Sequence, residues 1–454
     1  MTIDPGRVHL VGVGGAHMSA IARLLLAQGV VVSGSDHRST PTTDELAGLG
    51  AIIALEHAAA NVDQVDLVVH TAAVGEDNPE IAEARRRSIP VLIRAEMVAR
   101  LIQGKRVIAV AGTHGKTTIS TLVSLILRQA GQSPTYLLGG DSLDLGPNAA
   151  WGEGPACVVE ADEFRSAFLE YDPDTAVISN VDPDHLEYFG TVENYRAEFD
   201  RFVNRIKPGG TLLACVDDKG SEAAFERAPP NLVRESYGLS ESASWSASNV
   251  RFGSDNVQLR VLHNGEVQGN LTVQPPGQHM VENALAAVAV TSREGVDFQT
   301  ISAAIRGFQG ARRRFELVGE GGGITVVDDY AHHPTEVRTV LATARARFGT
   351  RRFVVVYQPL TYTRIEYLWD DWVNLWSEAN ELVVLETFGS REQPQSPSAS
   401  DLVAAITTPK AIYAPNVEDA ARQAVALARS GDVVLTVGAD EVCEVGPRVV
   451  ELLQ

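Results

Sequence analysis

The sequence predicts an α/β protein with three domains. At 454 residues the chain exceeds the ~250–300 residues at which a single hydrophobic core stops growing. Short apolar runs, each followed by a helical pattern, begin at residues 8–13, 107–112 and 324–330. A hydrophobic content of 44% supports fully folded domains. We therefore predict domains over residues 1–104, 105–310 and 311–454.

The charge of the chain excludes one class of partner. Its formal net charge is -20 and its pI is about 5.0, so its surface would repel a polyanion such as DNA. A local cationic pocket for a nucleotide remains compatible with this charge. We predict no nucleic-acid partner.

The cysteines and the apolar runs indicate the cellular compartment of the protein. Cys157, Cys215 and Cys443 are far apart and odd in number, which favours neither a disulfide framework nor a zinc site. The first residues lack the basic segment and the apolar core of a signal peptide. No apolar run reaches the ~18 residues that a membrane span needs. We expect a cytoplasmic protein without membrane attachment, and the sequence shows no sign of an obligatory protein partner.

The first domain shows the alternation of a small doubly wound sheet. After the strand at 8–13, the pattern predicts the following elements: a helix at 18–28, a strand at 30–33, a strand at 66–70, a helix at 78–87 and a strand at 91–93.

The other two domains repeat this alternation. In the middle domain a strand at 107–112 leads into a long helix after Lys116, and residues 208–275 are richer in short strands and turns. The last domain is predicted from a strand at 324–330, a helix at 335–347, a strand at 351–359, a helix at 365–379 and a strand at 381–386. Residues 390–400, rich in Pro, Ser and Gln, are expected to form a surface loop or lid.

The strongest motif lies between a strand and a helix. It comprises Gly112, Thr113, His114, Gly115, Lys116, Thr117 and Thr118. In this position backbone N–H groups and the helix N-terminus bind a phosphate, Lys116 adds a positive charge, and Thr117 can ligate magnesium. Val110 stands where the general phosphate-loop pattern has glycine, so the motif is a variant. The alternative is an ordinary strand-to-helix turn.

Carboxylates gather after two later strands. Glu160, Asp162 and Glu163 end an apolar run, and they would repel one another unless a cation lay between them. A further run at 176–180 leads to a second oxygen cluster and His185. The alternatives are a solvated strand end and a structural histidine. The favoured interpretation is a magnesium site.

The first strand ends in a second glycine-rich turn. Gly12, Gly14 and Gly15 resemble a dinucleotide-binding turn, and Asp36 lies about 20 residues on, where it could meet a ribose hydroxyl. Alone this signal is weak, and it does not imply redox chemistry.

Taken together, these motifs resemble those of the Mur ligase family over nearly the whole chain. The resemblance is carried by GVGGAHMS (12–19), SGSD (33–36), DNPE (77–80), RAEM (94–97), AGTHGKTT (111–118), EADE (160–163), DPDH (182–185), NALAA (283–287), RRRFE (312–316), DDYAHHPTE (328–336), QPLTYTR (358–364) and VGADEV (437–442).

The resemblance implies a fold and a set of site residues. It implies a Rossmann-like N-terminal domain for a UDP-sugar, a central P-loop ATPase-type domain with a mixed sheet, and a Rossmann-like C-terminal domain that admits an amino acid. ATP and Mg²⁺ would be the cofactors. The implied UDP contacts are Gly14, Gly15, Ser19 and Asp36. The implied metal ligands are Thr117, Glu163 and His185, with Lys116 on the ATP phosphates. The further nucleotide contacts would be His279, Asn283, Arg314 and Asp329, and His332, His333 and Arg364 would face the reacting groups.

The resemblance also implies a reaction and substrates. A carboxylate is activated as an acyl phosphate and joined to an amine, with His332 or His333 as the base or as a structural residue. No lysine occurs between His185 and Lys207, where family members that add later amino acids have a carbamylated lysine. The alanine-adding ligases and their tripeptide-recycling relatives both lack this lysine. Because the first and third domains carry the alanine-adding motifs almost unbroken, the resemblance implies UDP-N-acetylmuramate and L-alanine as substrates.

Departures from the family pattern keep two alternatives open. Phe164, Arg165, Ala167 and Leu360 differ from the usual alanine-adding pattern, and Phe164 with Ala167 look more like a ligase that recycles a tripeptide. A non-catalytic UDP-sugar sensor is the second alternative. Arg165 is expected to face solvent, to pair with an acid or to meet an anionic substrate.

Overall fold

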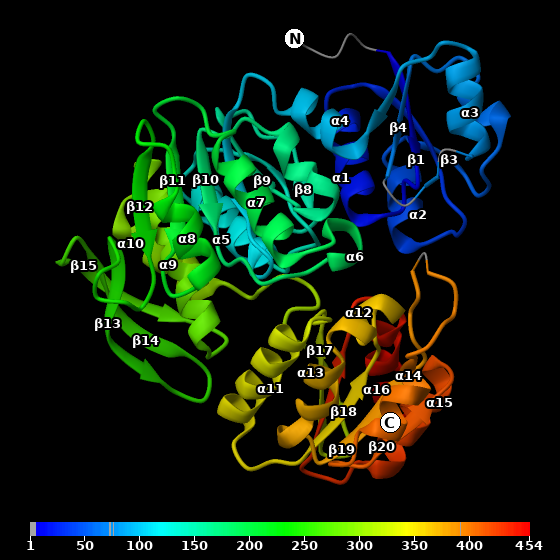
Figure 1. Cartoon of the computed structure of the whole chain (residues 1–454), viewed down its shortest axis with the longest axis vertical. Helices are drawn as coiled ribbons and strands as arrows, with labels where there is room; N and C mark the ends of the chain where they lie inside the picture. Colours follow the sequence, from blue (N-terminus) through cyan, green and yellow to red (C-terminus); the bar gives the residue numbers. More distant parts are fainter. Residues whose placement is uncertain (1–5, 72–73, 76, 391) are drawn as a thin grey trace. The chain divides into compact units, whose positions relative to one another are not determined.

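The computed structural model of the protein contains three β-sheets with flanking helices (Figure 1). The structure describes residues 6–71, 74–75, 77–390 and 392–454. The first five residues, on which the signal-peptide expectation rests, and residue 391 of the expected loop lie outside this range. The chain divides into two compact units, the first formed by Met1–Ser248, Arg260–Asn270 and Glu282–Phe308, and the second by Asn249–Leu259, Leu271–Val281 and Gln309–Gln454.

The first sheet is entirely parallel and has the order β3-β2-β1-β4-β5. Its strands are β1 (Arg7–Val11), β2 (Val31–Ser35), β3 (Ile52–Ala54), β4 (Leu67–His70) and β5 (Val91–Ile93). Its helices are α1 (Ala16–Ala27), α2 (Pro41–Gly48), the short η1 (Ala59–Val62), α3 (Pro79–Arg86) and α4 (Arg94–Leu101). The chain turns in opposite directions from β1 to β2 and from β1 to β4, so the carboxyl end of β1 is the point at which such sheets bind ligands.

The second sheet is mixed and has the order β15-β14-β13-β12-β11-β10-β6-β9-β7-β8. Its strands are β6 (Arg106–Ala111), β7 (Thr135–Leu137), β8 (Ala149–Ala150), β9 (Ala156–Glu160), β10 (Thr175–Ile178), β11 (Thr211–Cys215), β12 (Val233–Tyr237), β13 (Trp245–Phe252), β14 (Val257–His263) and β15 (Glu266–Val273). Strand β8 pairs antiparallel with β7, whereas β6 lies parallel between β10 and β9.

Helices accompany this sheet along the chain. They are α5 (Lys116–Gln129), the short η2 (Phe164–Glu170), α6 (Leu186–Phe189), α7 (Val192–Val203), α8 (Lys219–Glu226), α9 (Gln278–Arg293) and α10 (Phe298–Gly307). Helix α5 is buried over most of its length, and its Ile119, Leu122, Val123 and Ile126 are fully buried. Burial of this kind holds the N-terminus of α5 at the carboxyl end of β6.

The third sheet has the order β16-β17-β21-β18-β19-β20, with only the edge strand β16 antiparallel to its neighbour. Its strands are β16 (Glu316–Gly321), β17 (Ile324–Asp329), β18 (Phe353–Tyr357), β19 (Glu381–Leu385), β20 (Ala411–Ala414) and β21 (Val433–Val437). Its helices are α11 (Pro334–Phe348), α12 (Tyr362–Tyr367), α13 (Trp369–Asn374), η3 (Trp376–Glu378), α14 (Ala399–Ala405), α15 (Val417–Leu427), η4 (Glu441–Glu444) and α16 (Val445–Leu453).

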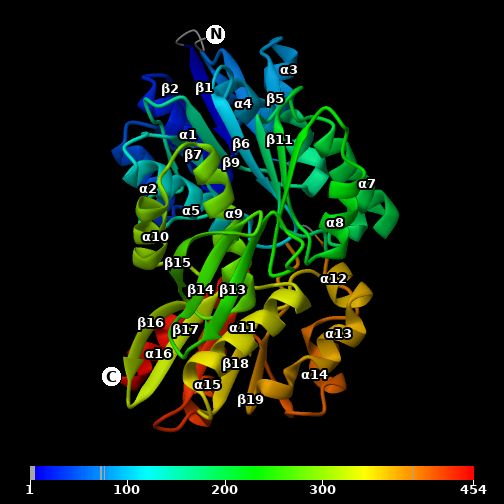
Figure 2. The ribbon, with the colours of Figure 1, turned by 90° about the vertical axis from the view of Figure 1, so that its left-hand side faces the viewer.

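Helices cover both faces of the third sheet (Figure 2). Val355 and Tyr357 of β18 point into a core shared with α11, α13 and α14, while Val354 and Val356 point into a second core shared with α15 and α16. Successive residues of a strand face opposite sides, so a strand buried on both faces is continuously apolar. This explains the run FVVVY in β18.

The predicted α/β class, with three sheets and a mixed central one, is confirmed by these sheets. One element is wrong: the single helix expected at 365–379 is α12, α13 and η3, separated at Leu368 and Leu375. Trp372 and Trp376 both lie against the ring of Tyr357, at 4.8 and 5.1 Å between ring centroids. The backbone of Leu368, with φ -110° and ψ 22°, departs from helical geometry and divides the segment there.

The short strands expected at 208–275 are β11 to β15. The boundaries predicted at 104/105 and 310/311 remain predictions. Among the described residues, no helix is both long enough and apolar enough to span a membrane.

Candidate functional site

The turn between β6 and α5 forms the centre of a candidate phosphate site. Gly112 has φ 130° and Gly115, the N-cap of α5, has φ 85°, a region that favours glycine. A Cβ on Gly112 would lie 2.0 Å from Ser179 Oγ, and one on Gly115 would lie 2.7 Å from Asn283 Oδ1. Both glycines are therefore required by close approach. The turn leaves the N-terminus of α5 as an anion-binding end.

Two neighbours on the segment after β10 hold this turn. His114 N donates to Asn180 Oδ1 at 2.8 Å, and Thr113 N donates to the carbonyl oxygen of Asn180 at 3.0 Å. The Thr113 hydroxyl is 2.8 Å from the carbonyl oxygen of Asp182. These hydrogen bonds fix the conformation of the turn at Thr113 and His114. Thr118 lies half-buried on the first turn of α5.

Lys116 is the positive charge of the site. Its Nζ donates to Gly112 O at 2.6 Å, Thr113 O at 3.0 Å and Glu163 Oε2 at 2.8 Å, so all three N–H groups have acceptors. Burial alone would lower the pKa of this ammonium, but the attraction of Glu163, Glu160 and Asp162 raises it. Lys116 is therefore firmly protonated.

Two buried carboxylates face the start of α5. Glu160 Oε2 accepts hydrogen bonds from Thr117 Oγ1 at 2.9 Å and from Gly139 N at 2.7 Å. Glu163 is only 3% exposed, and burial raises the pKa of its carboxyl although Lys116 opposes the shift. This set offers hydroxyl and carboxylate oxygens, the ligands that Mg²⁺ prefers.

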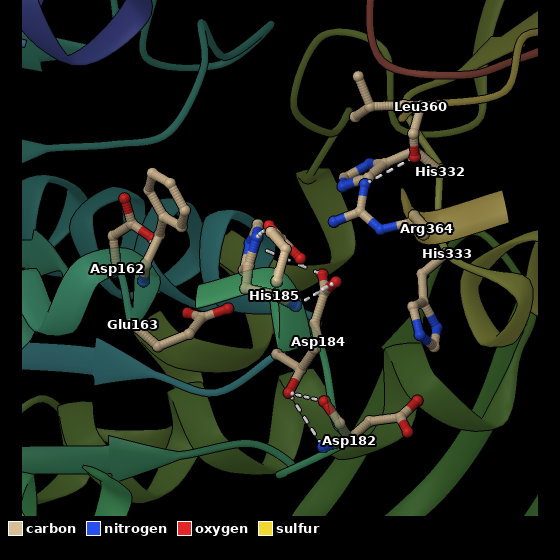
Figure 3. A network of polar contacts seen from close by, with 12 residues as sticks. Asp162, Glu163, Asp182, Asp184, His185, His332, His333, Leu360 and Arg364 are labelled. Atoms are coloured by element: carbon tan, nitrogen blue, oxygen red, sulfur yellow. Dashed lines mark hydrogen bonds and ion pairs between the residues drawn. The ribbon is translucent and has the colours of Figure 1, made fainter. Parts of the chain in front are cut away.

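His185 lies beside this carboxylate cluster (Figure 3). It caps α6 with φ 53°, and its ring centroid is 4.7 Å from that of Phe164. Its charge would lower the pKa of Glu163, so the two groups are close. Lys116, Thr117, Glu163, His185 and Asn283 are thus brought together in the first unit.

The glycine turn after β1 is also built around a carboxylate. Asp36 Oδ2 accepts from Gly14 N at 2.9 Å, and a Cβ on Gly14 would lie 2.9 Å from that oxygen. Gly15 is the exposed N-cap of α1. Ser19 lies deeper: it is 1% exposed and its hydroxyl donates to Ala16 O at 2.9 Å.

The remaining predicted residues, apart from Asn283, lie in the second unit. Asp329 at the end of β17 accepts from Phe315 N and Ala331 N, each at 2.8 Å. Burial raises the pKa of the Asp329 carboxyl to about 6. Arg314 lies over the Tyr330 ring at 5.2 Å. Burial and the charge of Arg314 lower the pKa of His279 to about 4, so His279 is neutral at pH 7.

His332 and His333 lie at the start of α11, and Arg364 lies within α12 (Figure 3). His333 is the N-cap of α11, and its Nδ1 accepts from Thr335 N at 3.3 Å. His332 Nδ1 is 3.1 Å from the carbonyl oxygen of Tyr330. Arg364 is 4% exposed and its Nη1 donates to Leu360 O at 2.9 Å.

Several residues of the site were missed by the sequence prediction. Glu160 belonged to the noted acidic cluster but was not chosen as a candidate, although its position at the very end of β9 would have supported it. Asn180 follows β10 and shows no signal beyond that position. Arg94, which donates to Asp162 Oδ2 at 2.7 Å, lies in the RAEM motif, but nothing in the sequence indicates its partner.

Comparisons with known proteins show the family of the chain. Three family models match the chain: the Mur ligase family catalytic domain at residues 7–106, the Mur ligase middle domain at 110–291, and the Mur ligase glutamate ligase domain at 313–440. The chain belongs to the Mur ligase family, as its motifs predicted.

Among its relatives, the UDP-N-acetylmuramate–L-alanine ligase of Mycobacterium sp. (strain JLS) is 41% identical, over 99% of this chain and 95% of the relative. The enzyme of the same name from Syntrophotalea carbinolica is 40% identical, over 98% of both chains. The solved UDP-N-acetylmuramate–alanine ligase MurC of Thermotoga maritima matches with a TM-score of 0.84 and 29% identity, over 98% of both chains. A murein peptide ligase from Psychrobacter arcticus matches with a TM-score of 0.79 and 25% identity, over 99% of this chain and 98% of that one.

Proposed function

We propose that this protein joins L-alanine to the carboxylate of UDP-N-acetylmuramate at the expense of ATP, in the synthesis of the peptidoglycan precursor. The observation that carries the proposal is the 40–41% identity, over nearly the full length, to ligases of that name. The Lys116–Glu163 contact at the start of α5 supports an ATP-dependent activity. A UDP-sugar sensor without catalysis would not need this arrangement.

The residues at the start of α5 fit a nucleotide with a divalent cation. Thr117, Glu160, Glu163 and His185 would hold Mg²⁺, because they combine hard oxygen ligands with an imidazole. When bound, Mg²⁺ would neutralise charge on the transferring phosphate. Lys116 would exchange one of its protein acceptors for a phosphate oxygen, and the N-terminus of α5 would donate N–H groups to another.

The reaction needs activation of a poor electrophile. A carboxylate does not react with an amine at neutral pH because its leaving group would be oxide. Transfer of the γ-phosphoryl group gives an acyl phosphate, and attack by the amine of L-alanine then releases phosphate. The task of Lys116 is to position the phosphates and balance their charge. Arg364 is proposed to stabilise the oxyanion that forms during attack.

The hydrogen bonds of the histidine pair support different roles for its two members. A carbonyl oxygen only accepts, so His332 Nδ1 carries a proton towards Tyr330 O and Nε2 of the neutral ring keeps its lone pair. His333 Nδ1 accepts from Thr335 N, so its Nε2 carries the proton. We therefore propose His332 as the base that takes the amine proton and His333 as the helix cap and a hydrogen-bond donor.

UDP-sugar recognition is assigned to the turn after β1. Gly14, Gly15 and the nearby N-terminus of α1 would meet the diphosphate, and Asp36 would remain close to the ribose. Because Ser19 is buried and bonded to Ala16 O, its contribution would be to shape α1 beneath the turn.

The assay that tests the proposal is phosphate release with UDP-N-acetylmuramate, ATP, Mg²⁺ and either L-alanine or a tripeptide containing L-Ala-D-Glu. We expect L-alanine to be the better substrate. Lys116→Ala should lower turnover by ~10²–10³, the usual effect of losing one charged transition-state contact, while UDP binding persists. Lys219→Ala, on the exposed start of α8, is the control. Normal turnover in Lys116→Ala would refute the mechanism.

A further inference from the structure

An ion pair joins the first and second sheets close to the candidate phosphate site. Arg94, the first residue of α4, donates from Nη2 to Asp162 Oδ2 at 2.7 Å. The two side chains are 12% and 22% exposed. Arg94 follows the edge strand β5 of the first sheet, whereas Asp162 follows β9 of the second, so the pair links segments from two sheets within one compact unit.

Other contacts show that the two sheets are held together around this pair. Arg23 of α1 is 7% exposed and its Nη1 donates to Asn148 Oδ1 at 2.5 Å. Asn148 Nδ2 in turn donates to Ala16 O at 2.6 Å. The start of α1, which follows the glycine turn, is therefore fixed against the second sheet, and Arg94 acts within a packed boundary.

Asp162 holds the turn that contains Glu163. Its Oδ1 accepts from Phe164 N at 3.0 Å and its carbonyl oxygen accepts from Phe168 N at 2.9 Å. Arg165 and Ser166 within this turn have φ of 53° and 58°. Left-handed conformations cost roughly 1–2 kcal/mol for residues other than glycine, so the turn depends on such external ties.

His17 completes the surroundings of the pair. It lies in the first turn of α1, where burial and the charge of Arg94 lower its pKa to about 3. A neutral imidazole leaves Arg94 free to direct its charge to Asp162. Lys116 also acts on both Asp162 and His17, which places all four groups in one cluster.

We propose that Arg94 is a positioning residue that couples the first domain to the nucleotide site. Through Asp162 it fixes the turn at 162–168, and this turn presents Glu163 to Lys116. The first domain then contributes to assembly of the phosphate and cation site, although Arg94 itself contacts neither. This positioning role rests on the proposed function, which identifies the nucleotide as ATP.

The first experiment reads the turn in the ligand-free protein. Hydrogen exchange of the Phe164 and Phe168 amides should be about tenfold faster in Arg94→Ala than in the parent, because the turn loses its tie to the first domain. Asp162→Asn, which retains an oxygen for Phe164 N but loses the ion pair, should show the same increase. Arg86→Ala, which removes an exposed arginine of the same domain, should leave both amides unchanged. Unchanged exchange in Arg94→Ala would overturn the inference.

The second experiment reads the consequence for binding. Calorimetric titration with Mg²⁺-ADP should show about tenfold weaker binding in Arg94→Ala, while titration with UDP gives the parent affinity. Arg94→Ala and Asp162→Asn combined should be no weaker than either alone, since both remove one interaction. Added guanidinium ion should partly restore Mg²⁺-ADP binding to Arg94→Ala and not to Asp162→Asn.

The outcomes separate the two proposals. A parent that binds no Mg²⁺-ADP would refute the proposed function, and the exchange data would still decide whether Arg94 holds the turn. Additive losses in the double variant, or equal loss of UDP and Mg²⁺-ADP binding, would assign Arg94 to general stability and overturn its positioning role.

Discussion

Removing the buried carboxylate of Glu80 should destabilise the first sheet next to the proposed UDP site. Glu80, the second residue of α3, is fully buried. Its Oε1 accepts from Asn61 Nδ2 at 2.6 Å and lies 3.2 Å from His9 Nε2. Its Oε2 accepts from Ser35 Oγ at 2.7 Å and lies 2.8 Å from His57 Nδ1. In the variant Glu80→Gln, an NH2 group replaces one of the two acceptor oxygens and faces side chains that donate hydrogen bonds to the carboxylate.

The magnitude follows from the pKa of this carboxyl. Burial alone would raise the pKa of Glu80, but hydrogen bonds from His9, Asn61 and Ser35 lower it from 4.5 to about 2. A shift of this size corresponds to about 3 kcal/mol of the free energy of unfolding. Because the folded-state pKa is depressed, this stability is fully present above pH 4.5 and is lost as the pH falls towards 2. Glu80→Gln should therefore cost about 2–4 kcal/mol at pH 7, and less below pH 4.

Urea unfolding at several pH values measures this difference. The control is Glu83→Gln on the same helix, whose carboxylate pairs with Arg86 and Arg87 at the surface and whose loss should hardly change stability. Since Ser35 immediately precedes Asp36, UDP binding should also weaken in Glu80→Gln. The reasoning fails if Glu80→Gln unfolds like the parent at pH 7, or if its deficit stays constant down to pH 3.

Three further changes have defined outcomes. His17→Lys, which adds a cation beside Arg94, should lower the melting temperature by several degrees, whereas His17→Gln should melt like the parent. The pKa of Asp329 is raised, so this carboxyl destabilises the fold as the pH rises from 4 to 6. In urea titrations the stability difference between Asp329→Asn and the parent should therefore shift in favour of the variant as the pH rises over that range, by up to about 2–3 kcal/mol. Because Arg165 is exposed, Arg165→Asp should change kcat/KM for L-alanine and for the tripeptide by equal factors. A selective loss of tripeptide use would instead place Arg165 at the substrate.

Local patterns predicted most of the strands and turns. Apolar runs such as FVVVY at 353–357 are buried on both faces, and such runs have few alternatives to a central parallel strand. The two-residue strand β8 and the three-residue β3 offer no comparable pattern, and they depend on neighbours far along the chain. The break at Leu368 could not be predicted because the segment around it contains no glycine or proline that would interrupt a helix.

The residues of the candidate site also divide into those that the local sequence predicts and those that it does not. Gly112, Gly115 and Lys116 were predictable because backbone geometry and charge at a strand-to-helix turn are local properties. Their partners are not local: Asn283 was indicated only by the family resemblance, and Asn180 reaches the turn only through the fold. The pairing of Arg94 with Asp162 likewise depends on two sheets meeting, and neither residue shows it by its own neighbours in sequence.

The three acceptors around Lys116 have a consequence for chemical labelling. Acylating reagents are attacked by the lone pair of an unprotonated amine. Lys116 keeps its proton and directs its N–H groups towards Gly112, Thr113 and Glu163. Lys219 and Lys410 are exposed and should be modified first. The rate at which Lys116 acquires label would then report how often its ammonium leaves these oxygens. Lysine-directed covalent inhibitors would react with this residue only during such excursions.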